Sequence, residues 1–366
     1  MKISNLTYIS CSTIPSALAN SVHVMKMCNS FASKGLSVNL VCKQSENWNG
    51  ETDALESYDC KNHFTISAFP NRKKGLLGSL SYILFATKQV FRTHGVVYSR
   101  YFYPLLPLLF LHKPFVLEFH ADINSLTRFI VKILIRRKEC KQLVFISQSL
   151  QELFVNKYHA DLSKCIVLAD ACDVSDAIEC NTKKSVGYVG HLYKGRGIEL
   201  LIEVAKRLPE YKFHLIGGKE PELSYYRSIS PDNMIYYGSV KHSELANYYS
   251  KFGIALAPYQ KKVYSADAEK SAETSKYCSP MKLFEYMAYK KAIICSDLPV
   301  FHEVGENGQE LIYQECNDVD GWVDSIIQLT NNDQLQRTIV ENAYSKFLAN
   351  YTWGSRVDKI IKFIEG

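Results

Sequence analysis

Short apolar runs alternate with amphipathic stretches through the first half of the chain. Short apolar runs between turn residues are typical of buried strands, and longer stretches that repeat apolar residues at helical spacing are typical of helices. Strands are expected at residues 2–10, 37–42, 63–69, 96–101, 114–120 and 143–147, and helices at about 20–34, 76–91, 125–142 and 149–158. The polar residues 43–63 are expected to be mostly loop. Repeated strand–helix units of this kind predict a doubly wound parallel sheet.

The alternation stops near residue 174 and then restarts. Residues 174–184 are polar, lack an apolar stripe and predict a linker between a first domain, 1–173, and a second domain, 185–345. In the second domain, strands are expected at 185–190, 212–218, 234–240, 254–259 and 292–297, and a helix at 197–208. The last residues, 346–366, are expected to be helical. Two domains with parallel sheets would leave a cleft at the carboxyl ends of their strands, where such folds bind ligands.

Residues 276–297 join a predicted helix to a buried strand and concentrate the candidate chemistry. Ser279 and Pro280 are a helix-start signal, with an N-cap hydroxyl and a proline at the first helical position. Lys282 and Glu285 lie off the apolar stripe, which consists of Leu283, Phe284, Met287 and Ala288. A helix N-terminus beside such a pair can hold an anion. A solvated Lys–Glu pair on an ordinary amphipathic helix has the same spacing and remains the alternative.

A glycine-rich loop, GHLYKGRG at residues 190–197, connects a predicted strand to a helix. Its glycines permit tight turning, and Lys194 and Arg196 bring positive charge to a helix N-terminus. The loop is a candidate diphosphate site. It does not match a phosphate-binding Walker loop or the dinucleotide fingerprint, and a short charged connection would look the same.

The basic excess of the chain lies in its first half. Residues 1–180 contain 20 Lys and Arg against 14 Asp and Glu, whereas residues 181–366 contain 23 of each class. This distribution favours an anionic partner for the first domain, either a membrane surface or a phosphorylated acceptor. Nucleic acid is not expected, because no basic motif is interleaved with aromatic residues.

The predicted helix 125–142 has six basic residues and a wide apolar face, and the stretches 76–85 and 101–111 are also apolar beside basic residues. These features suggest docking on an anionic membrane, although a core helix with a basic outer face is the alternative. The eleven cysteines are scattered without zinc spacing, and this is typical of a reducing cytoplasm. No signal peptide or transmembrane run is seen. The expected location is the cytoplasm or the inner face of the cell membrane.

Two segments of the second domain carry a family resemblance. Residues 186–218 and 279–304 together resemble the nucleotide-sugar half of the retaining glycosyltransferases with the GT-B fold (group 1, or family 4). Residues 14–42 resemble the acceptor half of members that build bacterial surface polysaccharides. The resemblance implies an α/β fold of two Rossmann-like domains, with the last helix crossing back to the first domain. It further implies transfer of a hexose-type sugar, with retention, from a UDP- or GDP-linked donor to a glycan or polyprenyl-linked acceptor.

The resemblance assigns roles to individual residues. Arg196 matches the basic residue that meets the donor diphosphate, and Lys282 is expected to support it. Glu285 matches the second glutamate of the E-x7-E motif, which binds the ribose hydroxyls. His120 matches the histidine near the transferring sugar. These four are the predicted catalytic residues. The predicted donor site further contains Pro15, Ser16, Gly190, His191, Gly217, Val240, Ser279, Pro280, Met281 and Leu283.

The chain also departs from the family pattern. Tyr277 stands at the first glutamate of the motif, His191 replaces an arginine, the loop at Pro15–Ser16 lacks glycine, and residues 170–173 replace a glycine-containing turn. No cofactor or metal is expected, because the nearest sequence to an Asp-x-Asp motif is Asp267-Ala268-Glu269.

Two other functions stay open: a GT-B nucleotide-sugar 2-epimerase, and a non-catalytic nucleotide-sugar-binding subunit. A lone histidine such as His120 can also be purely structural at a strand end. Glu118 and Asp122 flank His120 and are candidates to tune it, and Arg100 follows the preceding strand.

Overall fold

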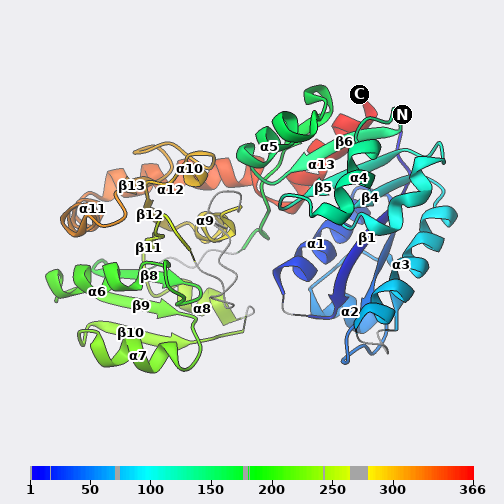
Figure 1. Cartoon of the computed structure of the whole chain (residues 1–366). Helices are drawn as coiled ribbons and strands as arrows, with labels where there is room; N and C mark the ends of the chain where they lie inside the picture. Colours follow the sequence, from blue (N-terminus) through cyan, green and yellow to red (C-terminus); the bar gives the residue numbers. More distant parts are fainter. Residues whose placement is uncertain are drawn as a thin grey trace. The chain divides into compact units, whose positions relative to one another are not determined.

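The chain folds into two compact units (Figure 1). The computed structural model describes residues 2–16, 18–70, 75–175, 180, 182–241, 244–263 and 279–366. Unit 1 consists of Met1–Asp170 and Trp353–Gly366, and unit 2 of Ala171–Thr352. Each unit contains one parallel sheet with helices around it, so the predicted α/β class is confirmed. Tyr277 and the segment Asp267–Glu269 lie outside the described residues.

Unit 1 is built on a parallel sheet in the order β3-β2-β1-β4-β5-β6-β7. Its strands are β1 (Asn5–Ile14), β2 (Ser37–Gln44), β3 (Thr65–Phe69), β4 (Val96–Ser99), β5 (Phe115–Phe119), β6 (Cys140–Phe145) and β7 (Cys165–Val167). Every residue of β4 and β5 is buried, as expected for strands that are covered on both faces. The strand order reverses between β1 and β4, and ligands of doubly wound sheets bind at such a switch point.

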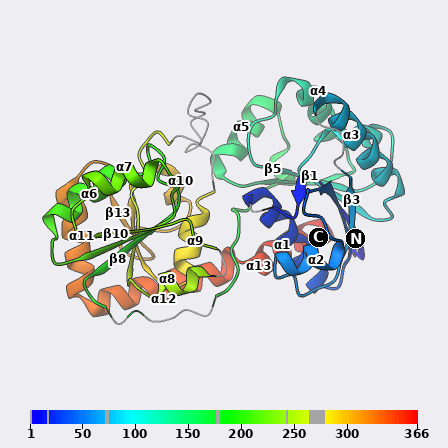
Figure 2. The ribbon, with the colours of Figure 1, turned by 90° about the horizontal axis from the view of Figure 1, so that it is seen from below.

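Helices cover both faces of this sheet (Figure 2). They are α1 (Ala19–Ser33), α2 (Glu51–Ser57), α3 (Gly75–Arg92), α4 (Ser125–Leu134), α5 (Gln148–Tyr158) and α13 (Trp353–Glu365), with the 3₁₀ helices η1 (Tyr103–Leu109) and η2 (Leu162–Lys164). The last helix, α13, packs against α1 although the two are far apart in the sequence. Helix α1 ends where the sequence indicates, because Gly35 follows its C-cap Lys34 with φ +83°.

The polar region 43–63 is mostly loop, as expected, and also contains the short helix α2, which buries Ala54 and Leu55. One prediction for unit 1 is wrong, because helix α4 ends at Leu134 and does not continue to residue 142. The reason is Arg137, whose guanidinium donates to the carbonyls of Leu109 and Leu111 and pairs with Glu139, so the chain turns there before β6.

Unit 2 is built on a second parallel sheet, in the order β10-β9-β8-β11-β12-β13. Its strands are β8 (Ser185–Val189), β9 (Lys212–Ile216), β10 (Met234–Gly238), β11 (Ile254–Ala257), β12 (Ala292–Ser296) and β13 (Ile312–Gln314). Its helices are α6 (Ile198–Arg207), α7 (Glu222–Ile229), α8 (Leu245–Tyr249), α9 (Met281–Ala288), α10 (Pro299–His302), α11 (Val319–Asn331) and α12 (Asp333–Asn350). The order reverses between β8 and β11. Trp322 on α11 fills the core of the unit and is fully buried.

The start of α9 differs from the prediction. The helix begins at Met281, its cap position is Pro280, and no side chain caps it. Ser279 therefore lies one position too early to be the N-cap, and its carbonyl accepts a hydrogen bond from the Met281 amide at 2.9 Å. The apolar stripe is placed as expected, because Leu283, Phe284, Met287 and Ala288 are fully buried.

Candidate functional site

Three loops of unit 2 meet at the carboxyl edge of neighbouring strands. Gly190 follows β8, Gly217 follows β9 and Val240 lies just after β10. The Gly190 amide donates to the Ile216 carbonyl at 2.8 Å, and the Gly217 amide donates to that of Gly238 at 2.7 Å. A Cβ on Gly217 would overlap the carbonyl of Gly190. This edge is therefore packed backbone against backbone beside the switch point.

Helix α9 is anchored to this edge by Tyr286. The Tyr286 hydroxyl accepts from the Val189 amide and donates to the Leu256 carbonyl, both at 3.1 Å. It thus ties α9 to the ends of β8 and β11, the two strands at the switch point. The anchor brings the first turn of α9 over Gly190, where a Cβ would overlap the Lys282 ammonium.

Two cations share aromatic rings at this position. The Lys282 ammonium lies 4.0 Å from the ring centre of Tyr188 and 5.1 Å from that of Tyr259. The guanidinium carbon of Arg196 lies 4.6 Å from the same Tyr259 ring. Neither cation forms an ion pair within the described residues. The Nε of Arg196 is buried and has no hydrogen-bond partner there.

The electrostatics of this site suit an anion. Burial lowers the pKa of Lys282 well below its usual value, and the nearby charge of Arg196 lowers it further, against a smaller opposing effect of Glu285. The pKa of His191 is also lowered, by burial and by Arg196, Lys282 and Lys219. Positive charges thus repel one another here, and an anionic ligand would relieve that repulsion.

The remaining residues of the predicted donor site lie along α9. Glu285, one turn after Lys282, is half-buried and accepts from the Tyr249 hydroxyl at 3.3 Å. Met281 is half-buried, whereas the Leu283 side chain is fully buried and faces the core. The Leu283 amide donates to the Pro280 carbonyl at 2.9 Å.

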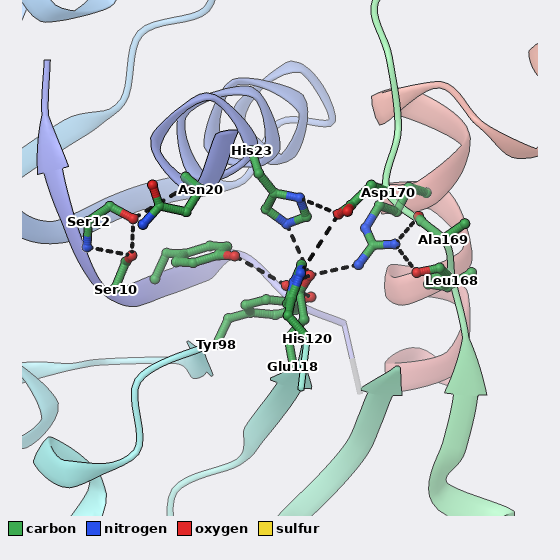
Figure 3. Close-up of polar contacts among 12 residues, drawn as sticks. Ser10, Ser12, Asn20, His23, Tyr98, Glu118, His120, Leu168, Ala169 and Asp170 are labelled. Carbon is green, nitrogen blue, oxygen red and sulfur yellow. Dashed lines mark hydrogen bonds and ion pairs between the residues drawn. The ribbon is translucent and has the colours of Figure 1, made fainter. Parts of the chain in front are cut away.

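A second polar cluster fills the switch point of unit 1, and the carboxylate of Glu118 lies at its centre (Figure 3). Glu118 is the second-last residue of β5 and is 1% exposed. Its Oε2 lies 2.6 Å from the Tyr98 hydroxyl and 3.2 Å from that of Tyr8. Its Oε1 lies 2.7 Å from both the Arg356 Nη2 and the His120 Nε2. Burial alone would raise the pKa of Glu118, but the surrounding His23, Arg356 and His120 hold it well below its usual value.

His120 shares its carboxylate partner with this cluster. Because ionised Glu118 can only accept, the Nε2 of His120 carries the proton, and Nδ1 is left as an acceptor. The pKa of His120 is lowered to about 4, first by burial and then by the charge of Arg100, against the effects of Glu118 and Asp170. The neutral ring can accept a hydrogen bond from a sugar hydroxyl through Nδ1.

His23, His120 and Asp170 place potential metal-ligand atoms within 4.8 Å of one another. The nitrogens of His23 lie 3.0 Å from Glu118 and 2.9 Å from Asp170. Arg356 already supplies a cation to this cluster. Its guanidinium donates to Glu118 and to the carbonyls of Leu168 and Ala169. The charge balance fits an ion-pair network, and we assign no metal site here.

The other predicted residues of unit 1 lie outside this cluster or at its border. Pro15 and Ser16 follow β1, and Ser16 exchanges hydrogen bonds with the Tyr58 hydroxyl at 2.6 and 2.8 Å. Asp122 does not contact His120, because it bonds to Lys157 and Tyr158 of α5. Glu118 does contact it, at 2.7 Å.

Several residues of these sites carry no signal in the sequence. Tyr188 and Tyr259 are two of 24 tyrosines, and their position beside the cations follows only from the sheet order. Arg356 and Trp353, whose ring lies 5.2 Å from that of His23, come from the last helix. His23 lies on the inward face of α1, and its spacing alone predicts a core position.

Comparisons with known proteins agree with this architecture. Residues 176–346 match the model of the family "Glycosyl transferases group 1". The O-antigen chain mannosyltransferase RfbU of Salmonella typhimurium is 25% identical over 232 residues, which cover 61% of this chain and 59% of that protein. The chain thus spans about three-fifths of the length of this curated relative.

Solved glycosyltransferase structures share the whole fold. A glycosyltransferase from Rickettsia africae ESF-5 has a TM-score of 0.73 at 12% identity, over 100% of this chain and 98% of that one. Anabaena Alr3699/HepE, solved in complex with UDP and glucose, has a TM-score of 0.70 at 12% identity, over 99% of both chains. The two parallel-sheet units and these structures together show that the chain has the GT-B fold, and residues 176–346 are similar to the group 1 glycosyltransferases.

Proposed function

We propose that this protein transfers a hexose-type sugar from a nucleotide diphosphate donor, UDP- or GDP-linked, to a growing bacterial surface glycan such as capsule or O-antigen. Unit 2 binds the donor, and unit 1 supplies the acceptor site. The relative RfbU is an O-antigen mannosyltransferase, and HepE was solved with UDP, which supports both parts of the proposal. We further propose that the anomeric configuration is retained and that the acceptor is linked to a polyprenyl lipid at the inner face of the membrane.

The pairing of Arg196 with Lys282 carries this proposal. When the bond between the anomeric carbon and the phosphate oxygen breaks, negative charge develops on the departing diphosphate. Two cations that lie over the same Tyr259 ring, without an ion-pair partner among the described residues, can receive that charge. They do so from fixed positions, so little reorganisation is needed during the reaction. The transfer therefore needs no metal ion in this proposal.

Two further residues have roles that fit their surroundings. Glu285 lies one helical turn beyond Lys282, and its carboxylate can accept two hydroxyl hydrogen bonds from a ribose. In unit 1, the Nδ1 of His120 can accept a hydrogen bond from a hydroxyl of the sugar or the acceptor.

The proposal is tested first by thermal shift with UDP, GDP, TDP and CMP and their common sugars. One nucleotide should stabilise the wild type by several degrees, and Arg196→Ala and Glu285→Ala should abolish that shift. Arg207→Ala is the matched control, because Arg207 is exposed on the neighbouring helix α6 and pairs with Asp320. If no nucleotide stabilises the protein, the proposal that unit 2 binds a nucleotide-sugar donor is contradicted.

Turnover is tested separately with the donor that binds and membrane extracts as the acceptor source. A transferase forms a larger glycan and releases the nucleotide diphosphate. Release of a free epimerised nucleotide sugar without an acceptor would show a 2-epimerase instead. Binding without turnover on any acceptor would show a binding subunit.

A further inference from the structure

Unit 1 carries a concentration of exposed apolar side chains that the proposed sugar transfer does not use. Among the described residues, nine of fifteen exposed large apolar side chains lie on α3, on η1 with the residue after it, and on α4. They are Leu76, Leu77, Leu80, Leu84, Phe91, Leu106, Phe110, Phe129 and Ile133. We call this set the apolar face. An exposed apolar concentration of this size marks a surface that binds something.

Helix α3 is apolar on two opposite sides. Its inward residues are Gly78, Tyr82, Ala86 and Val90. At 3.6 residues per turn, its five exposed apolar residues fall within an arc of about 100° on another side. Core packing explains the first set only. The second set, which includes Leu76 at 76% exposed and Leu84 at 71%, is exposed among the described residues of unit 1.

The three elements are neighbours, so their exposed residues belong to one region of the unit. Helix η1 contacts both α3 and α4, and Figure 2 shows α3 and α4 on the same side of the unit 1 sheet. Phe110, which follows η1, is 82% exposed, and Phe129 on α4 is 72% exposed. Two aromatic side chains thus extend the apolar face beyond α3.

The charged residues on the three elements of the apolar face have one sign. The segments of α3, η1 and α4 contain four basic residues, Lys88, Arg92, Arg128 and Lys132, and no acidic residue. Lys88 and Arg92 follow directly after the apolar arc of α3, at about 120° and 160° from Leu76 on the helical wheel. Lysine and arginine beside exposed leucine and phenylalanine are typical of surfaces that enter the headgroup layer of an anionic membrane.

We propose that the apolar face docks unit 1 on an anionic lipid surface, with its leucine and phenylalanine side chains in the headgroup layer and its basic residues on lipid phosphates. None of the helices searched among the described residues is long and apolar enough to cross a membrane. The docking is therefore reversible and peripheral. It does not depend on the identity of the donor, and it presents unit 1 to acceptors that are held in a membrane.

Vesicle flotation with the full chain tests this proposal, using phosphatidylcholine vesicles with and without phosphatidylglycerol. The wild type should float with the anionic vesicles, more at low salt than at high salt. The double variant Leu77→Asp/Leu84→Asp should bind about tenfold more weakly, because both side chains would have to enter the lipid layer as charges. The matched control is Leu162→Asp/Leu348→Asp, which changes the net charge equally at exposed leucines outside the apolar face and should float like the wild type.

Three outcomes would overturn the proposal. These are failure of the wild type to bind anionic vesicles at low salt, equal binding by both double variants, and a dimer in light scattering that only Leu77→Asp/Leu84→Asp dissociates. The last outcome would make the apolar face a contact between two copies. Equal unfolding temperatures of the three proteins would show that any loss of binding is not a loss of fold. The donor-induced thermal shift should stay unchanged in both variants, which separates this test from that of the proposed function.

Discussion

Arg356 donates from its Nη2 to the Oε1 of Glu118 at 2.7 Å, and both side chains are about 1% exposed. The bond joins the last helix of the chain to the end of β5, at the residue that also holds His120. The same guanidinium donates to the Leu168 and Ala169 carbonyls, where the first part of unit 1 ends. One buried side chain thus fixes both a candidate catalytic histidine and the closing helix of unit 1.

Loss of this guanidinium should destabilise the fold strongly. Arg356→Ala leaves the carboxylate of Glu118 buried without its cation, and the free energy of unfolding should fall by about 3–5 kcal/mol. Urea unfolding measures this change. Arg207→Ala, which breaks the exposed pair with Asp320, should cost less than about 1 kcal/mol. Similar small losses in both variants would show that Arg356 does not balance the cluster.

The stability of unit 1 should fall in acid, beginning near neutral pH. The folded state lowers the pKa of His120 from 6.5 to about 4, so between these values the unfolded chain binds more protons. Stability is then lost as the pH falls from about 6.5 to about 4. The lowered pKa values of Glu118 and Asp170 add a further loss below the usual range of carboxylates.

The variant His120→Gln isolates the contribution of this histidine. Unfolding temperatures measured from pH 7 to pH 4 should fall less steeply in the variant than in the wild type. The variant should still lose stability as the pH falls, because it retains His214 in unit 2, whose pKa is also lowered to about 4. Identical slopes would mean that His120 titrates normally in the folded protein.

Nucleotide affinity should depend on the charge of Lys282. Its pKa is lowered in the unliganded protein by burial and by Arg196, and a bound diphosphate would raise it. Affinity should therefore be highest at low pH and fall as the pH rises through the lowered pKa. Lys282→Arg should remove this fall, because a guanidinium stays charged. Titration calorimetry with the matching nucleoside diphosphate, at pH values from neutral up to the usual lysine pKa of about 10.4, follows the change.

Removal of the Lys282 charge gives the control for that pH dependence. Lys282→Met should weaken binding about 10- to 100-fold, as expected for a lost hydrogen bond to a charged group. Lys206→Met should leave it unchanged, because Lys206 is exposed on α6 and pairs with Glu203. A pH dependence that persists in Lys282→Met would place the titrating group elsewhere.

The sequence predicts the strands and the cationic loop better than it predicts the side chains that contact the candidate site residues. Alternating apolar runs identify the sheets. The family resemblance singles out Arg196, Lys282 and His120, which lie at strand or helix ends. The sequence does not identify Tyr188 and Tyr259 as site residues, since a tyrosine beside a strand usually packs in a core. Only the neighbouring positions of β8 and β11 in the sheet bring the two together. The role of Arg356 cannot be predicted from the sequence either, because its partner Glu118 is 238 residues away. Helix α4 is predicted too long, as periodicity does not show that Arg137 caps loop carbonyls.

The packed glycines behind the proposed donor site should tolerate no side chain. Gly217 has φ +114°, and a Cβ there would overlap the Gly190 carbonyl, whereas Gly308 has φ +75° with open space around it. Both alanine variants strain the backbone, and Gly217→Ala adds the overlap and a φ further from the left-handed helical region. Gly217→Ala should be less stable than Gly308→Ala by roughly 1–3 kcal/mol. It should also lose nucleotide-induced stabilisation, because displacement of Gly190 moves the residue on which Lys282 packs. Equal stability and equal nucleotide shifts would show that this edge can yield without disturbing the site.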